Sequence, residues 1–439
     1  MTSTSTTTRS TWSNWAGSVT ARPVRVERPR SVDEVVEVVR RAREEGLRVK
    51  PVGAGHSFSA VAQAPDVQVD LTDLQGLEHA DPGTGRVTLA AGTRLHAIPP
   101  LLSHLGLDMP NLGDIDRQSI SGAVSTGTHG TGLDHGGLAT QVVGLTLVDG
   151  TGRVRTLTQE DPELAGAVVG LGALGVVTSV TLQLAPAFVL RAVERPEPLQ
   201  HVLESFVERC RSEDHFEFFW FPHTHVASTR TNTRLPHDVP LAPLRRRQRL
   251  VDEVLLANGA FAAACRLGVH APSLVRPVNR ASARLLARRE FTDRSHRVFT
   301  TSRRVRFHET EWAVPVEALP SVQRDVDALV RRHGWRISFP LEFRAAAADD
   351  LWLSTAHGRT TGYVAAHRYH REDPGDYFAA VRDVALAHGG RPHWGKMHDL
   401  DLGTLAGLYP RMGDFLALRD LLDPDRVFAN AYLERVLGA

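Results

Sequence analysis

The sequence predicts an α+β protein made of two packed units. Three observations support this class: the chain has 439 residues, helix-period and strand-period patterns both recur along it, and the pattern changes in texture after Pro186. A chain of this length exceeds what one ordinary hydrophobic core can hold. Hydrophobic residues make up 42% and charged residues 23%, which is typical of a globular protein.

Charge and cysteine content exclude several partners. The formal net charge is +1, so no overall field favours nucleic acid or an anionic membrane.

Residues 1–11 are polar and of low complexity, which predicts a disordered lead-in rather than a signal peptide. No stretch approaches the roughly 20 apolar residues of a membrane span. Two cysteines, Cys210 and Cys265, are too few for a disulfide framework and favour a reduced, cytoplasmic protein.

The first half reads as a helix followed by strands. Ser31 is a suitable N-cap for a helix over 32–45, Glu34 completes a capping box, and Gly46 is placed to end the helix. Valines at helical spacing give this helix an apolar face. The other predicted elements of this half are strands at 47–51, 67–71, 86–91, 143–148, 153–157 and 176–182, and helices at 95–105 and from Asp161.

The second half mixes aromatic strands with helices. Residues 244–290 are rich in Arg and Ala and read as mostly helical. We interpret the three arginines at 245–247 as a solvated face or loop, because the chain lacks the basic charge and interleaved aromatics of a nucleic-acid site. The other predicted elements are strands at 215–221, 298–307, 337–344 and 363–369, and helices at 374–388 and 415–437.

A glycine turn after the strand at 47–51 is the first candidate for chemistry. Gly53 and Gly55 let the backbone approach a ligand closely, and amides in such a turn can converge on an anion. His56 follows at once, and an imidazole held against a ligand can do chemistry. The alternative is an ordinary turn with a surface histidine. Since 57–65 does not read as a helix, a Rossmann domain is disfavoured.

A long segment, 109–137, is dense in Gly, Ser and Thr and contains few regular elements. Loops of this length inside a compact domain are usually functional or disordered. Ile115, Ile120 and Val124 would anchor it, which favours a functional loop. Residues 126–132 offer many small donors and backbone amides to a polar ligand.

Charged side chains on two later strands form the second candidate. Residues two apart share a strand face, so Glu342 points with Arg344, and His367 with Tyr369. Lys396 lies in a loop suited to close contact. These groups would suit a ligand with several hydroxyls or a carbonyl, although Glu342 and Arg344 could instead form a structural pair.

The histidines of the second half are also candidate metal ligands. The candidate groups are His367 with His370, and His393 with His398 and Asp399, but neither has a recognised ligand spacing on a predicted helix. We predict no metal.

Five blocks of the chain together resemble the vanillyl-alcohol-oxidase superfamily of flavoenzymes, in particular its branch of aldonolactone oxidoreductases and alditol oxidases. The resemblance covers about 13–438, nearly the whole chain. The blocks are the Trp15 motif, the His56 loop, Ser119 to Gly132, Gly172 to Val177, and Pro392 to Lys396.

The resemblance implies a bipartite fold. A PCMH-type FAD-binding domain would cover 12–186, and a substrate-binding cap domain with a large mixed sheet would cover 187–400. The C-terminal segment, 401–439, would pack back on the FAD-binding domain.

The resemblance also implies that FAD is the cofactor. His56 matches the histidine that bonds covalently to the flavin 8-methyl carbon in these families, so we predict a covalent link. Such a link should make the flavin more oxidising and prevent its loss. The implied cofactor-binding residues are Val52, Gly53, Ala54, Gly55, His56, Ser57, Gly113, Asp114, Ser119, Gly122, Thr126, Gly127, Thr128, His129, Val177 and Lys396.

The implied catalytic residues surround a hydroxyl-bearing substrate carbon, from which hydride would pass to flavin N5. Glu342 and Arg344 match the Glu-x-Arg pair that faces the substrate in these enzymes, and His367 and Lys396 match two further active-site positions. Lys396 and Arg344 would polarise the oxygen. His367 would take the hydroxyl proton, and Glu342 would orient the substrate or hold Arg344.

Two departures narrow the expected substrate. Alditol oxidases carry serine where Asp114 stands and threonine where Tyr369 stands, which argues against a small linear polyol and adds both residues to the candidate catalytic site. Residues 111–116 are similar to the actinobacterial gulonolactone and arabinonolactone enzymes. We therefore expect oxidation of a five-membered sugar lactone at its C2 hydroxyl. The alternatives are an alditol oxidase and a dehydrogenase with another acceptor.

The electron acceptor depends on position 113. Gly113 stands where some dehydrogenase relatives have an alanine thought to shield the flavin from oxygen. A glycine leaves space, which favours an oxidase that produces hydrogen peroxide.

Overall fold

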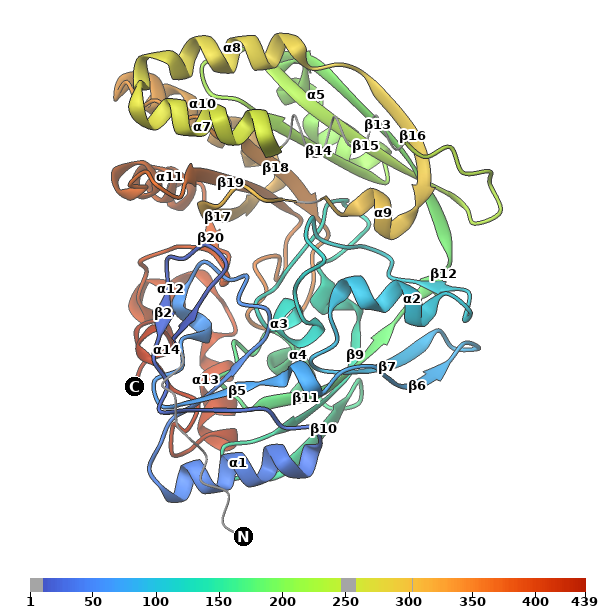
Figure 1. Cartoon of the computed structure of the whole chain (residues 1–439), viewed down its shortest axis with the longest axis vertical. Coiled ribbons are helices and arrows are strands. Elements are labelled where there is room, and N and C mark those ends of the chain that lie inside the picture. Colours follow the sequence, from blue (N-terminus) through green and yellow to red (C-terminus); the bar gives the residue numbers. More distant parts are fainter. Residues whose placement is uncertain (1–10, 246–257, 302) are drawn as a thin grey trace.

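The computed structural model describes residues 11–245, 258–301 and 303–439. Figure 1 shows two units: segments from both ends of the chain build the lower one, and the middle of the chain builds the upper one. Nearly all of the predicted lead-in and residues 246–257 of the Arg-rich region lie outside the described residues.

A three-stranded parallel sheet opens the lower unit, with β5 (Val67–Asp70) between β3 (Arg25–Glu27) and β4 (Val49–Val52). Helix α1 (Val32–Glu44) has the predicted N-cap, since the Ser31 side chain accepts from the backbone of Glu34. The Glu34 carboxylate accepts from the backbone of Arg30 rather than that of Ser31. Val35, Val39 and Ala42 bury the apolar face of α1.

A five-stranded antiparallel sheet completes the lower unit, in the order β10-β9-β11-β7-β6. The alternating burial of β11 shows one face in the core and one partly open. Short helix α3 packs against β11. The elements are β6 (Leu77–Asp81), β7 (Arg86–Ala90), β9 (Val142–Val148), β10 (Val154–Thr158), β11 (Val176–Gln183), α2 (Ile98–Leu102), α3 (Ile120–Ser125), α4 (Leu164–Ala167), and the two-residue strands β1 (Trp12–Ser13), β2 (Thr20–Ala21), β8 (Leu107–Asp108) and β12 (Ala185–Pro186).

The upper unit is built on an eight-stranded sheet in the order β16-β13-β15-β14-β18-β19-β17-β20. All neighbouring strands in this sheet are antiparallel, whereas we predicted a mixed sheet. Helix α5 connects β13 to β14, but these two strands are not neighbours, because β15 lies between them and is antiparallel to both. Helices α7 and α8 lie at the end of this unit far from the lower one (Figure 1). The elements are β13 (Phe188–Pro198), β14 (His215–Trp220), β15 (Val226–Pro236), β16 (Arg289–Arg294), β17 (Phe307–Pro315), β18 (Leu341–Ala346), β19 (Thr361–Tyr369), β20 (Arg391–Pro392), α5 (Leu199–Ser212), α7 (Phe261–His270), α8 (Val275–Leu285), α9 (Ser295–Phe299), α10 (Leu319–Arg332) and α11 (Gly375–Ala387).

The chain returns to the lower unit through helices α12 (Leu402–Leu408), α13 (Met412–Leu422) and α14 (Ala431–Leu437), as Figure 1 shows. The backbone of Val49 donates to Val427. The Asn430 side chain donates to the carbonyls of Ala60, Val61 and Gln63. These bonds fix the C-terminal segment beside the strand and loop that surround the glycine turn.

Several predicted elements differ from the structure, and the strand predicted at 337–344, for example, begins only at Leu341. The strand predicted at 298–307 is wrong: Val298 and Phe299 end helix α9 and are buried there, and β17 begins only at Phe307. The helix predicted at 95–105 shortens to α2 after a 3₁₀ turn, because Pro99 and Pro100 lie in its first turn. The helix predicted over 415–437 is two helices, α13 and α14, with Asp423 ending the first.

Among the described residues, no helix combines the length and apolar character needed to cross a membrane. Cys210 and Cys265 are both buried and unpaired.

Candidate active site

The glycine turn after β4 forms one wall of a first cavity, together with the start of α3 and the turn before β11. A Cβ at Gly53 would lie 2.3 Å from the Ser119 hydroxyl oxygen, which caps α3 by accepting from Gly122. Any larger residue at position 53 would therefore displace the Ser119 hydroxyl from its capping position. Ten of the predicted cofactor residues line this cavity: Val52, Gly53, Ala54, Gly55, His56, Ser57, Ser119, Gly122, Thr126 and Val177.

His56 stands where this cavity meets a second one and lines both. Its ring lies 5.8 Å from that of Trp15 in a stacked arrangement. Burial, aided by the cations Arg94 and Arg117, lowers the pKa of His56 to about 4, so the ring is neutral at pH 7. Among the described residues, its buried Nδ1 has no hydrogen-bond partner.

The second cavity lies between the two units and gathers charged side chains. Most of the residues predicted to contact the substrate or the flavin ring meet in this cavity. They come from loops of the lower unit, from β18 and β19, and from the loop after β20. They are Gly113, Asp114, Thr128, His129, Glu342, Arg344, His367 and Lys396.

Two predicted residues lie outside these cavities. Tyr369 is buried in a cluster with Phe58, Phe307 and Phe339, and it lines a separate cavity beside His370. Gly127 contributes its backbone, because its carbonyl lies 3.1 Å from His393 Nε2.

Arg344 is the centre of one charged group in the second cavity. Its Nε donates to Glu217 over 2.8 Å, and its Nη2 lies 3.1 Å from Asp114 and also contacts Glu342. Burial raises the pKa of Glu342 to about 7, despite the attraction of Arg344. Burial would also raise the pKa of Asp114, but Arg303 and Arg344 outweigh it and hold that pKa well below its usual range. The expected Glu342–Arg344 pair thus exists and also faces the cavity.

Lys396 is the centre of a second charged group. Its Nζ lies 2.6 Å from Glu309 and 3.7 Å from Glu311, two buried carboxylates on one face of β17. Burial opposes the ammonium, but these carboxylates raise the pKa of Lys396. His367 Nδ1 lies 2.9 Å from the Pro340 carbonyl, and its Nε2 lies 3.5 Å from Glu309.

Sequence reasoning missed Glu309 and Glu311, and also Glu217, Arg303 and Lys50. Phe307, Glu309 and Glu311 stand two residues apart in β17, so they share one face of the strand. This period-2 pattern could have indicated a buried acidic face. Lys50, in β4, is fully buried in the wall of the first cavity and donates to the carbonyls of Leu171, Gly172 and Phe428. Burial lowers the pKa of Lys50 to about 7.

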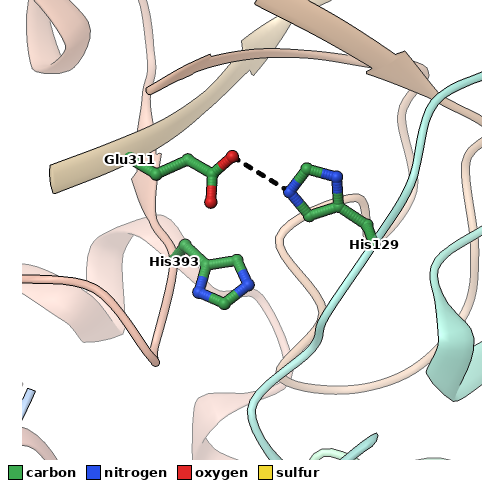
Figure 2. A group of neighbouring side chains, drawn as sticks. All are labelled: His129, Glu311 and His393. Carbon is green, nitrogen blue, oxygen red and sulfur yellow. Dashed lines mark ion pairs between the residues drawn. The ribbon is translucent and has the colours of Figure 1, made fainter. Parts of the chain in front are cut away.

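Figure 2 shows a group of three side chains, His129, Glu311 and His393. All three are buried, and Lys396 Nζ lies 3.7 Å from Glu311. Their potential ligand atoms all lie within 4.8 Å of one another. His393 Nδ1 accepts from the Gly395 amide, while its Nε2 faces the Gly127 carbonyl. Both nitrogens of His393 are therefore used, and the nearby Lys396 ammonium would repel a metal ion. These three side chains therefore form a cluster of polar and charged groups held by hydrogen bonds and an ion pair.

Comparison with known proteins matches two family models. Residues 180–436 match the family described as D-arabinono-1,4-lactone oxidase, and residues 23–158 match an FAD binding domain. In overall fold the chain is similar to a solvent-stable cholesterol oxidase, with a TM-score of 0.81, 18% identity, and coverage of 98% of this chain and 97% of that one.

Several curated relatives align over nearly their whole length. An L-gulono-1,4-lactone dehydrogenase of Mycobacterium tuberculosis is 43% identical, over 97% of this chain and 99% of its own. An L-gulonolactone oxidase of Bos taurus is 32% identical, over 96% and 97%. An alditol oxidase of a Streptomyces species is 31% identical, over 97% and 98%.

Proposed function

This chain belongs to the D-arabinono-1,4-lactone oxidase family of FAD-dependent oxidoreductases, and we propose that it oxidises the C2 hydroxyl of a five-membered sugar lactone. The substrate would be of the L-gulono-1,4-lactone or D-arabinono-1,4-lactone type. The observation that carries the proposal is the second cavity, where Asp114, Glu342, Arg344, His367 and Lys396 meet directly beside His56.

The first cavity fits FAD. Its walls are backbone amides and small side chains, and a Cβ at Gly53 would close the gap to Ser119. When bound, FAD supplies an acceptor for a hydride, that is, for two electrons and a proton. We assign the residues predicted for the cofactor to this role, and with them the division into an FAD-binding domain (12–186), a cap domain (187–400) and a returning C-terminal segment.

We assign the covalent attachment of FAD to His56. Attachment needs a neutral imidazole with a free lone pair, and the low pKa of His56 keeps its ring neutral. The buried Nδ1 without a partner among the described residues is the candidate atom, because an unsatisfied buried nitrogen is costly unless a ligand uses it.

The residues of the second cavity have different roles toward the substrate. Lys396 and Arg344 are permanent cations that polarise the reacting oxygen. His367 carries its N–H at Nδ1, toward Pro340, so it takes the hydroxyl proton at Nε2. The imidazolium so formed faces the Glu309 carboxylate, which favours it. Asp114 and Glu342 hold Arg344 in place, and Tyr369 supports β19 from its buried cluster.

The substrate is tested by mixing the purified protein with candidate compounds without oxygen and following the yellow absorption of the flavin. We expect L-gulono-1,4-lactone or D-arabinono-1,4-lactone to bleach it, and xylitol to bleach it at least about 10-fold more slowly. Faster bleaching by xylitol would favour the alternative, an alditol oxidase. No bleaching by any of the three would contradict an enzyme of this class.

The acceptor is tested by readmitting air. We propose oxygen, because Gly113 carries no side chain beside Thr128 and His129, where a Cβ would lie 3.2 Å from both. Rapid recovery of the yellow colour with hydrogen peroxide formation is expected. Slow recovery that a dye acceptor accelerates would instead identify a dehydrogenase.

The covalent link is tested by acid precipitation. The parent protein should give a yellow pellet, whereas His56→Ala should release its FAD into the supernatant. A colourless parent pellet with FAD in the supernatant would refute the link and leave FAD binding intact.

A further inference from the structure

Leu171 and Gly172, in the turn before β11, both have a left-handed backbone, with φ of 55° and 60°. Leucine rarely adopts this conformation, because its Cβ crowds the following carbonyl oxygen. Leu171 is one of three such non-glycine residues among the described residues, and of the three it alone lines the first cavity. Its side chain is buried in the core, which anchors the leucine but does not favour a left-handed backbone. Other contacts must therefore stabilise this turn.

Lys50 makes such contacts from β4, just before the glycine turn. Its side chain is 1% exposed. Its Nζ donates to the Gly172 carbonyl over 2.9 Å, and to the carbonyls of Leu171 and Phe428 over 3.3 and 3.4 Å. Three acceptors match the three donors of an ammonium group. One cation thus joins β4, the left-handed turn and the C-terminal segment.

Donation to three carbonyls is not by itself evidence of a role toward a ligand. The side chains of Arg391 and Asn430 also donate to three carbonyls each. Lys50 differs because two of its acceptors belong to consecutive left-handed residues. It differs also because Lys50, Leu171 and Gly172 all line the first cavity.

The direction of these carbonyls determines the direction of one backbone amide. The described residues contain no cis peptide bond, so the N–H of Gly172 points away from the Leu171 carbonyl and therefore away from Lys50. Among the described residues, this amide has no hydrogen-bond partner. The next amide, that of Ala173, is already used, because it donates to the Gly170 carbonyl over 2.8 Å. The Gly172 amide is therefore left as a donor for a ligand.

We propose that Lys50 is a positioning residue for the cofactor, which holds Leu171 and Gly172 in the left-handed form that presents the Gly172 amide to the first cavity. The inference rests on the proposed function for the statement that FAD fills this cavity. Lys50 acts through the turn, because its own donors face carbonyls. Without Lys50 the turn would populate other conformations, and only the left-handed fraction would bind FAD with full affinity.

The direct test measures the dissociation constant of FAD by fluorescence titration of flavin-free His56→Ala protein. In this background Lys50→Met, which keeps an apolar side chain and removes the donors, should raise the dissociation constant on the order of 10-fold. With His56 intact, Lys50→Met should also lower the flavin-to-protein ratio. Folded Lys50→Met with unchanged affinity and flavin content would overturn the proposal. A parent protein without FAD would instead contradict the proposed function, so the two failures are distinguishable.

Arg419→Met separates positioning from folding stability. Arg419 is a buried cation of the same unit that donates to the carbonyls of Leu437 and Gly438, and it does not line the first cavity. Its loss should lower the melting temperature and leave the dissociation constant of FAD unchanged. If Arg419→Met weakened FAD binding as much as Lys50→Met does, Lys50 would act through general stability and the assignment would fail.

Leu171→Val tests the turn itself and serves if Lys50→Met does not fold. A β-branched side chain disfavours the left-handed backbone further, so this variant should bind FAD several-fold more weakly. Leu174→Val makes the same change at a buried leucine of the same turn whose φ is not left-handed, and it should leave the affinity unchanged. Equal affinities of the two variants would contradict the link between the left-handed turn and the cofactor.

Hydrogen exchange gives a readout that needs no turnover. Without FAD, peptides that cover the turn should exchange faster in Lys50→Met than in the His56→Ala reference, because the turn is no longer held. Saturating FAD should slow exchange of the Gly172 amide in the reference. Equal exchange of the turn with and without Lys50, or no protection by bound FAD, would overturn the proposal.

Discussion

The two cavities are built from different materials. The first is shaped by backbone and small side chains, and Lys50 and His56 are the ionisable groups among the described residues that line it. The second is lined by carboxylates and cations that depend on one another through Arg344 and Lys396. We therefore expect ligand binding in the first cavity to be most sensitive to steric changes, and the second cavity to be most sensitive to the loss of a charge.

The strongest way to break the second cavity is Lys396→Met. This variant leaves Glu309 and Glu311 buried without their shared cation and removes a group that polarises the substrate oxygen. We expect kcat/KM to fall on the order of 10³-fold and thermal stability to fall, while acid-precipitated protein stays yellow. Arg324→Met, an exposed cation on α10, is the matched control. Near-normal turnover in Lys396→Met would remove Lys396 from the catalytic group.

The matching way to break the first cavity is Gly53→Ala, which changes no charge. The new methyl would meet the Ser119 hydroxyl at 2.3 Å, so we expect a loss of about 1–3 kcal/mol in the free energy of unfolding and a lower flavin-to-protein ratio. Gly407→Ala, where a Cβ meets nothing within 4 Å, is the control. Adding Ser119→Gly should partly restore flavin content. No effect of Gly53→Ala on flavin would show that this approach does not shape the cofactor site.

The smallest effect is a pair of opposite pH dependences, measured by chemical unfolding of flavin-free His56→Ala protein. The lowered pKa of Lys50 means that the unfolded chain binds more protons between about pH 7 and 10.5, so its contribution makes stability rise with pH there. The raised pKa of Glu342 means that the folded chain binds more protons between about pH 4.5 and 7, so stability falls as pH rises there. Each slope is at most about 1.4 kcal/mol per pH unit. Lys50→Met should remove the first slope and Glu342→Gln the second; slopes that survive both changes would contradict the two assignments.

Sequence reasoning reached the first cavity more completely than the second, for a physical reason. The glycine turn, the Ser119 cap and the strand ending at Gln183 are local patterns, and each contributes to the cavity through its own backbone. The second cavity depends on partners from separate strands. Glu342 and Arg344 could be paired by strand alternation, but Glu217, their neighbour on β14, could not be placed without the sheet order.

The glutamates of β17 were lost through one wrong element. The strand predicted at 298–307 ends where β17 begins, so it does not include the acidic face at Glu309 and Glu311. Nothing local in the sequence shows that β17 pairs with β19, which carries His367 and Tyr369. Lys50 was read as an ordinary strand residue, since nothing local shows that its ammonium is buried among three carbonyls.

The hydrogen bonds of Asn430 have a consequence for biosynthesis. Its side chain completes the segment 60–63, a few residues beyond His56, although 370 positions separate Asn430 from Ala60. The pocket wall behind the glycine turn therefore stays unfinished until this distant segment has also been translated. Capture of the prosthetic group would then wait for the later segment rather than accompany synthesis of the glycine turn.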